Sequence, residues 1–122
     1  MKKRILLVDD ETTVLQVYGQ MLRNFGYEVD AVDNKEQAET LLRKKKYSAA
    51  IFDLQLSNLE IQEGLELSSL ACRLQRDIRI ILITAYGRSD IKSMAINSGV
   101  HCYLEKPVST KVILDSLREL KN

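Results

Sequence analysis

The chain has 122 residues, of which 45% are hydrophobic and 29% are charged. These proportions are typical of one globular domain and exclude a disordered or fibrous chain. The 18 basic and 17 acidic residues leave a formal net charge of +1, which gives no reason to expect long-range attraction to nucleic acid or anionic membranes.

The first half of the chain alternates strand-like and helix-like patterns. Residues 4–8 form an unbroken apolar run, which predicts a strand buried on both faces. Apolar residues then recur at helical spacing as far as Gly26, which is placed to end that helix. Residues 27–32 predict a second strand, Asn34 is placed to cap the next helix, and residues 49–53 predict a third strand. The predicted inner faces are Val14, Tyr18, Met21 and Phe25 in the first helix, and Ala38, Leu41 and Leu42 in the second.

The second half continues this alternation. After a polar loop a helix is predicted from about Leu65, and a very hydrophobic strand follows at residues 78–84. A shorter helix is predicted at residues 89–97, a fifth strand at residues 101–105, and a last helix that Ser109 caps. The predicted inner faces are Leu67, Leu70, Ala71 and Leu74 in the third helix, and Ile113, Leu117 and Leu120 in the last.

Five strand–helix units in succession predict a single α/β domain over residues 1–122. Helices of this length between short apolar strands imply parallel pairing with right-handed crossovers. Helices therefore cover both faces of one sheet, in three layers.

Polar side chains collect where the predicted strands end. In open parallel sheets, ligands bind outside the carboxyl ends of the strands, so these side chains are expected to share one crevice. Taken singly, each has an ordinary explanation, such as helix capping by an aspartate. Their presence on four strands together favours a site. The residues are Asp9, Asp10 and Glu11 after the first strand, Asp53 in the third, Thr84 in the fourth and Lys106 after the fifth.

The clustered acids predict a divalent cation. Two carboxylates about 4 Å apart repel by roughly 4 kcal/mol at an effective dielectric constant near 20. Lys106 supplies only one positive charge, and oxygen ligands without histidine or cysteine favour Mg²⁺, with Mn²⁺ or Ca²⁺ as substitutes. A carboxylate such as Asp53 can be the nucleophile that forms an acyl phosphate, while Mg²⁺, Lys106 and Thr84 contact the phosphoryl oxygens.

Over its whole length the chain resembles the receiver domain of two-component response regulators. The matching stretches are ILLVDDE, AIFDLQL, GLEL, ILITAYG and GVHCYLEKPVS, in the order and spacing of that family. The resemblance implies a flavodoxin-like, doubly wound sheet of five parallel strands in the order 2-1-3-4-5, with five helices. It also implies a cytoplasmic domain that is regulatory rather than enzymatic, and that catalyses only its own phosphorylation and slow dephosphorylation.

The resemblance assigns roles to individual residues. Asp53 would accept a phosphoryl group from the phosphohistidine of a sensor histidine kinase or a phosphotransfer protein. On phosphorylation, Thr84 would move to the phosphoryl group and the Tyr103 ring would turn inward. The implied Mg²⁺ ligands are Asp10 and Asp53 through their side chains, Gln55 through its backbone carbonyl and Asp9 through water. The implied phosphoryl-binding and switch residues are Thr84, Lys106 and Tyr103, with a cis bond between Lys106 and Pro107.

The implied partners bind the surface of the fourth helix, fifth strand and fifth helix, which would change shape on phosphorylation. This surface would bind an output domain or a downstream protein, and the resemblance also allows a homodimer that forms on phosphorylation. No direct binding to nucleic acid or membrane is implied.

The chain departs from the family pattern beside Asp53. Where many members read DxxMPxMDG, this chain reads DLQLSNLEIQEG, with Ser57 at the proline position and three extra residues before Gly64. This difference predicts a longer loop there. Gln55 and Tyr86 occupy the two family positions that tune hydrolysis of the acyl phosphate, and the bulk of Tyr86 favours a longer-lived phosphoryl state.

Three other functions remain alternatives. A haloacid-dehalogenase-like phosphatase requires DxDxT after its first strand, whereas DDETT has no second acid at that offset. A flavin or nucleotide carrier requires a Gly-rich phosphate loop in the same place, where three acids would repel phosphate. A non-phosphorylated pseudo-receiver would act as a docking module, but the signature residues are intact.

Two remaining features have structural explanations. The basic run at residues 43–47 (RKKKY) ends a helix, where cations complement the helix dipole, and it predicts a solvated face rather than a nucleic-acid site. Cys72 and Cys102 lie far apart without metal-ligand spacing, which predicts reduced thiols in a cytoplasmic protein.

Overall fold

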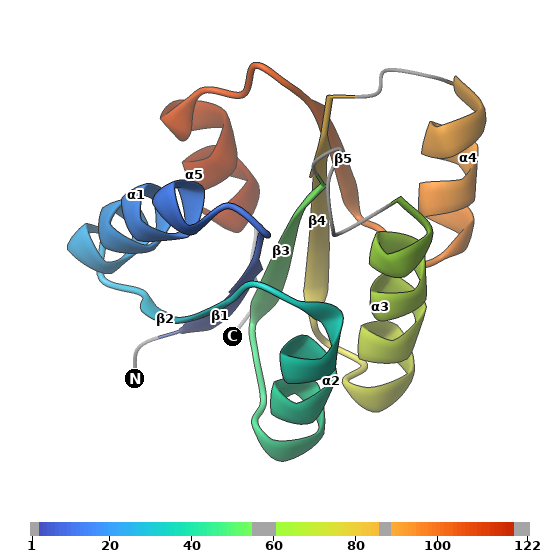
Figure 1. Ribbon diagram of the computed structural model, residues 1–122, viewed down its shortest axis with the longest axis horizontal. Coiled ribbons are helices and arrows are strands. Elements are labelled where there is room, and N and C mark those ends of the chain that lie inside the picture. Colours follow the sequence, from blue (N-terminus) through green and yellow to red (C-terminus); the bar gives the residue numbers. More distant parts are fainter. Residues whose placement is uncertain (1–2, 55–60, 86–88, 119–122) are drawn as a thin grey trace.

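The computed structural model describes residues 3–54, 61–85 and 89–118. Strands and helices alternate along the chain, as Figure 1 shows. The strands are β1 (Arg4–Val8), β2 (Glu28–Val32), β3 (Ala49–Leu54), β4 (Arg79–Thr84) and β5 (Cys102–Glu105). The helices are α1 (Thr12–Asn24), α2 (Lys35–Lys44), α3 (Ile61–Leu74), α4 (Ser89–Asn97) and α5 (Thr110–Arg118).

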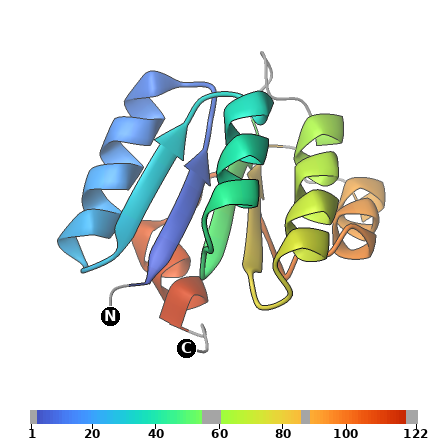
Figure 2. The same ribbon diagram turned by 90° about the horizontal axis from the view of Figure 1, so that it is seen from below.

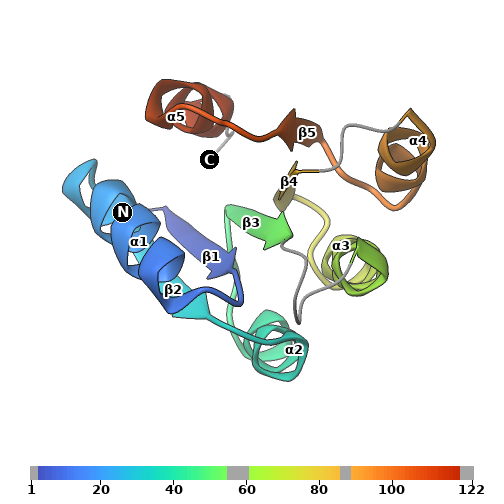
Figure 3. The same ribbon diagram turned by 45° about the horizontal axis from the view of Figure 1, so that its top comes forward.

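The five strands form one parallel sheet in the order β2-β1-β3-β4-β5. Every neighbouring pair is parallel, and the register places Val8 beside Phe52 and Leu54 beside Thr84. Seen nearly along the strands, α1 and α5 cover one face of the sheet, and α2, α3 and α4 lie on the other (Figure 3). The predicted fold class and strand order are therefore confirmed. In the described ranges, no helix is both long enough and apolar enough to cross a membrane.

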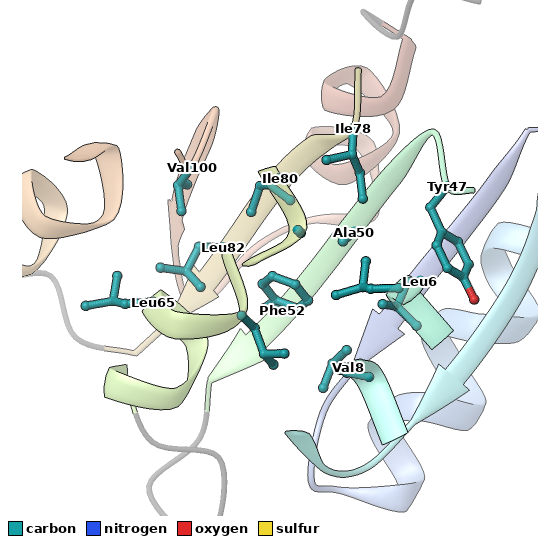
Figure 4. Close-up of a cluster of buried hydrophobic side chains, with 14 of the residues drawn as sticks. Leu6, Val8, Tyr47, Ala50, Phe52, Leu65, Ile78, Ile80, Leu82 and Val100 are labelled. Carbon is teal, nitrogen blue, oxygen red and sulfur yellow. The ribbon is translucent and has the colours of Figure 1, made fainter. Parts of the chain in front are cut away.

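The core lies in two layers, one on each face of the sheet. Successive residues of a strand point to opposite faces, so Leu6 and Val8 join one layer while Ile5 and Leu7 join the other. Figure 4 shows the first layer, in which Phe52 of β3 lies among apolar side chains from neighbouring elements. Since all these strands carry apolar side chains on both faces, helices must cover both.

Two predicted helix caps are present. The Asn34 side chain accepts a hydrogen bond from the Gln37 amide at 2.8 Å, and it occupies the N-cap of α2. The Ser109 hydroxyl accepts one from the Val112 amide at 3.2 Å, at the start of α5. Each cap satisfies a backbone donor that the first turn of a helix leaves without a partner.

The inner face of α1 is displaced by one residue from the prediction. Leu15 and Leu22 are buried against the sheet, whereas Val14 and Met21 are only half-buried. Phe25 is 59% exposed because the helix has already ended there. The prediction identified the edge of the apolar stripe rather than its centre.

The start of α3 and the end of its inner face also differ from the prediction. The helix begins at Ile61, four residues before Leu65, and its first turn carries Glu63, which complements the helix dipole. Gly64 costs about 1 kcal/mol in a helix interior, which is why the sequence pattern placed the start after it. At the other end, Leu74 is 40% exposed rather than buried.

Gly99 provides a stability prediction. Its φ of +97° is unfavourable for any side chain, and an added Cβ would lie 2.6 Å from the Cys72 sulfur. Gly99→Ala is therefore expected to lower the free energy of unfolding by about 2 kcal/mol, from strain plus overpacking. Gly26 is the matched control, because its φ of +95° is similar but a Cβ there meets nothing within 4 Å.

Urea denaturation of Gly99→Ala and Gly26→Ala measures the two costs separately. Gly26→Ala should lose only about 1 kcal/mol. Cys72→Ala in the Gly99→Ala background should recover part of the larger loss. Equal losses at the two glycines would show that the contact with Cys72 carries no cost.

Candidate functional site

The polar residues that follow the strands meet at one edge of the sheet. Asp9 comes directly after β1, and its amide donates to the Val32 carbonyl at 3.2 Å, so it continues the sheet. Asp53 is the fifth residue of β3, and Thr84 is the last residue of β4. The Lys106 amide donates to the Thr84 carbonyl at 2.8 Å, which fixes the chain after β5 at the same edge. Figure 3 looks toward this edge, where the strand arrowheads lie.

Asp53 and Lys106 form a close ion pair. The Lys106 Nζ lies 2.7 Å from Oδ1 of Asp53, whose side chain is fully buried, while the lysine side chain is 26% exposed. Burial raises the pKa of Asp53, and the ammonium of Lys106 opposes this rise without cancelling it. One cation therefore does not compensate for the loss of solvation of this carboxylate.

Asp9 is the second buried acid of the site. Its Oδ1 accepts a hydrogen bond from the Glu11 amide at 2.9 Å, whereas its buried Oδ2 accepts none from the residues described. Burial raises the pKa of Asp9 to about 8, and the negative charge of Asp53 adds to this rise, although the Glu11 amide opposes it. Neither Asp9 nor Asp10 caps α1, since the N-cap is Glu11.

These carboxylates fit a hard divalent cation. The site contains the buried oxygen Oδ2 of Asp9 with no donor, a second buried acid at Asp53, and Asp10 next in the chain. Oxygen donors with excess negative charge suit Mg²⁺, which keeps several waters and needs only one or two carboxylates. Within residues 3–54, 61–85 and 89–118, no three acidic, histidine or cysteine side chains converge as a ready-made cage. A site of this kind would thus depend on water and backbone ligands as well.

The two predicted switch residues, Thr84 and Tyr103, differ in their burial and surroundings. Thr84 is fully buried at the acidic edge. Tyr103 pairs with Leu82 in the sheet, is half-buried, and packs against the core layer on the α2–α3–α4 side. Burial raises the pKa of Tyr103, and the charges that add to the rise are those of Glu105 and Asp90 rather than Asp53. The bond between Lys106 and Pro107 is cis.

Some sequence predictions lie outside the described residues. They are those for Gln55, Ser57 and the loop around them, that for Tyr86, and that for Leu120 in the last helix.

The structure adds Tyr18 to the surroundings of the site. This half-buried residue of α1 has its pKa raised by burial and also by the negative charge of Asp53. The helical spacing predicted only that Tyr18 lies on the core face of its helix. The sequence feature that could have indicated this role is the position of Tyr18 in the helix that begins just after Asp9 and Asp10.

Comparison with protein families supports a single assignment. The family described as "Response regulator receiver domain" matches residues 5–118. The alginate biosynthesis transcriptional regulatory protein AlgB of Pseudomonas putida is 38% identical over 108 residues, which cover 87% of this chain and 23% of AlgB. The chain thus spans about a quarter of the length of that relative.

Two solved structures have the same fold. A CheY-like response regulator receiver domain from Methanospirillum hungatei superposes with a TM-score of 0.88 at 30% identity, covering 98% of this chain and 93% of that one. A response regulator from Burkholderia pseudomallei, solved with a phosphorylated aspartic acid, a calcium ion and citrate, has a TM-score of 0.86 at 31% identity. The similarity covers 97% of this chain and 68% of that protein.

Proposed function

This chain belongs to the response regulator receiver domain family, and from that premise we propose that it is a phosphorylatable switch with Asp53 as the phosphoacceptor. The observation that carries the proposal is the fully buried Asp53 carboxylate, 2.7 Å from the Lys106 ammonium at the acidic edge of the sheet. The phosphoryl donor would be a phosphohistidine on a sensor histidine kinase or a phosphotransfer protein.

The residues supply a nucleophile and charge stabilisation. An Asp53 carboxylate oxygen would form a bond to phosphorus while the phosphorus–nitrogen bond of phosphohistidine breaks, and its electron pair returns to the imidazole. A carboxylate nucleophile needs no general base. Lys106 would hold an oxygen of the transferred group, and the buried Thr84 hydroxyl would approach another.

The acidic residues would hold Mg²⁺, or Mn²⁺ in its place. Asp10 and Asp53 would bind through their side chains, Gln55 through its carbonyl and Asp9 through water. When bound, the ion supplies positive charge that lowers the pKa values of these acids and offsets the charge on the phosphoryl oxygens. The Burkholderia response regulator was solved with a calcium ion and a phosphorylated aspartic acid, which supports a divalent cation for this chain as well.

The output of the switch would be regulatory. Phosphorylation adds negative charge beside Lys106 and would draw Thr84 and Tyr103 toward Asp53, which biases the surface of α4, β5 and α5. An output domain, a downstream protein or a second phosphorylated copy would bind this surface. The domain would catalyse only its own phosphorylation and slow dephosphorylation.

Acetyl phosphate with Mg²⁺, followed by intact-mass measurement, tests the proposal. The chain should gain about 80 Da, the mass of one phosphoryl group, and hydroxylamine should remove it as expected for an acyl phosphate. Asp53→Asn should abolish the gain because asparagine is not a nucleophile. Asp33→Asn is the matched control, since Asp33 is exposed at the end of β2 and should leave the gain intact.

Two of the alternative functions predict other results. Absence of the adduct from a folded wild-type chain would identify a docking module and overturn the proposal. Continuous release of phosphate from p-nitrophenyl phosphate, at many turnovers per chain, would identify a phosphatase.

A further inference from the structure

A second polar site lies at the opposite end of the sheet from Asp53, where the strands begin. There α2 ends in the basic run at residues 43–46, and α3 ends just before Gln75 and Arg76. These segments line a cavity of about 520 Å³, which we call the basic hollow. Figures 1 and 2 show α2 and α3 side by side over this part of the sheet. The cationic side chains that line the hollow are Arg43, Lys44, Lys45, Lys46 and Arg76.

The Gln75 side chain holds the two halves of the basic hollow together. Its Nε2 donates to the carbonyls of Leu42 and Lys45 at 2.9 and 2.7 Å. Its Oε1 accepts from the Tyr47 amide at 2.8 Å. These hydrogen bonds join residues about 30 positions apart in the sequence. They fix Arg76, which follows Gln75, relative to the basic run. The cations are therefore gathered by the fold and not by sequence proximity alone.

Most cations of the basic hollow have no carboxylate partner. Lys45 pairs with Asp30 at 3.3 Å. The other four make no ion pair with any residue that the structure describes; they are Arg43, Lys44, Lys46 and Arg76. Elsewhere on the molecule, Lys35 and Lys111 lie 3.0 Å from a carboxylate. Positive charge is thus concentrated here, although the whole chain has a net charge of only +1.

Helix dipoles explain only part of this concentration. The C-termini of α2 and α3 carry roughly half a negative charge each, which accounts for about one cation between them. Among the residues that the structure describes, Asp77 is the only acid that lines the hollow. Net positive charge therefore remains, and it is available to an anionic partner.

Apolar side chains also line part of the basic hollow. Leu42, Leu74 and Ile78 contribute to its lining. Leu42 and Ile78 are almost fully buried, but Leu74 is 40% exposed, although the sequence pattern placed it on the inner face. An exposed leucine in the same lining as five cations suits a ligand that carries both carboxylates and apolar side chains.

We propose that the basic hollow docks an acidic segment of a partner protein, with apolar side chains of that segment seated on Leu74. Nucleic acid fits less well, because Tyr47, the aromatic residue that lines the hollow in the described part of the chain, is only 5% exposed and offers no surface on which bases stack. A membrane fits less well, because a flat bilayer cannot enter a concave site. This docking is independent of Asp53, which lies at the other end of the strands.

Fluorescence anisotropy with a short labelled peptide that alternates glutamate and leucine tests the proposal. Binding should weaken as ionic strength rises, because the attraction is between solvent-exposed charges. The double variant Lys46→Glu and Arg76→Glu should bind about tenfold more weakly. Lys92→Glu is the matched control: Lys92 is an exposed cation on α4, away from the hollow, and its reversal should change affinity less than twofold.

Two peptide controls separate charge from apolar contact. Replacing glutamate with glutamine should abolish binding, and replacing leucine with serine should weaken it several-fold. Unchanged thermal unfolding of the charge-reversal variant would show that it folds, as expected for exposed positions. The proposal is overturned if Lys92→Glu weakens binding as much as the double variant does. It is also overturned if an oligonucleotide of equal charge, or vesicles with anionic lipid, bind more tightly than the peptide.

Discussion

Asp9→Asn is expected to raise the free energy of unfolding of the metal-free protein at pH 8 by about 3 kcal/mol. Burial and the charge of Asp53 raise the pKa of Asp9 from its usual 3.8 to about 8. Each unit of such a shift corresponds to about 1.4 kcal/mol. The expected gain in the free energy of unfolding is smaller than the full pKa shift of Asp9 would give, because water and small structural relaxations weaken the repulsion between Asp9 and Asp53. Asparagine has nearly the same shape but never ionises, so the substitution removes the penalty without leaving a cavity.

The sign and pH window of this effect follow from the direction of the shift. The folded state holds the Asp9 proton more tightly than the unfolded state, so the stability of the wild type falls as pH rises from 3.8 to about 8. Below 3.8 both states are protonated, and the variant should gain little. The difference should grow through this window and become constant above it.

Urea denaturation at several pH values, with EDTA present, measures the difference. Asp33→Asn is again the control, because Asp33 is exposed and should show no such trend. Mg²⁺ should stabilise the wild type more than Asp9→Asn, because the variant has lost one acid of the site. A pH-independent difference would contradict the assignment of the penalty to ionisation of Asp9.

The sheet could be predicted from the sequence because its strands are short, apolar and regularly spaced. The predicted strand at residues 78–84 became Arg79–Thr84, and that at residues 101–105 became Cys102–Glu105. The buried faces of the helices were predicted less accurately, because the half-buried and the buried residues of α1 are similarly hydrophobic. The early start of α3 was missed because Gly64, which is poor in helices, lies inside its first turn.

The sequence was enough to predict which residues come together at the ends of the strands. It was not enough to predict how their side chains are oriented and buried. Parallel strands bring their carboxyl ends to one edge, which is enough to bring Asp53 near Lys106. The sequence could not indicate that Asp9 is buried with one oxygen lacking a donor, nor that Tyr18 lies within reach of the Asp53 charge. It also could not indicate that Gln75 ties Arg76 to the distant basic run, since that contact depends on the packing of α3 against α2.

Lys106→Met is expected to lower the free energy of unfolding at pH 8 by about 3 kcal/mol, because it leaves the Asp53 charge buried without its cation. The pKa of Asp53, already raised by burial, should rise further once the ammonium is gone. The unfolded state ionises near the usual value of 3.8, so the loss should be small at pH 4 and grow as pH rises above it. The variant should therefore unfold most easily under alkaline conditions.

A double-mutant cycle with Asp53→Asn isolates the pair. If the loss comes from an uncompensated carboxylate, the double variant should be more stable than Lys106→Met alone at pH 8, with a coupling energy of about 2 kcal/mol. Lys111→Met is the surface control: its ammonium also pairs with a carboxylate, that of Asp115 at 3.0 Å, but its side chain is 84% exposed. Exposed pairs are typically worth under about 1 kcal/mol, so this control should change little. Equal effects at Lys106 and Lys111 would mean that burial adds nothing to the first pair, and that Asp53 remains ionised without Lys106.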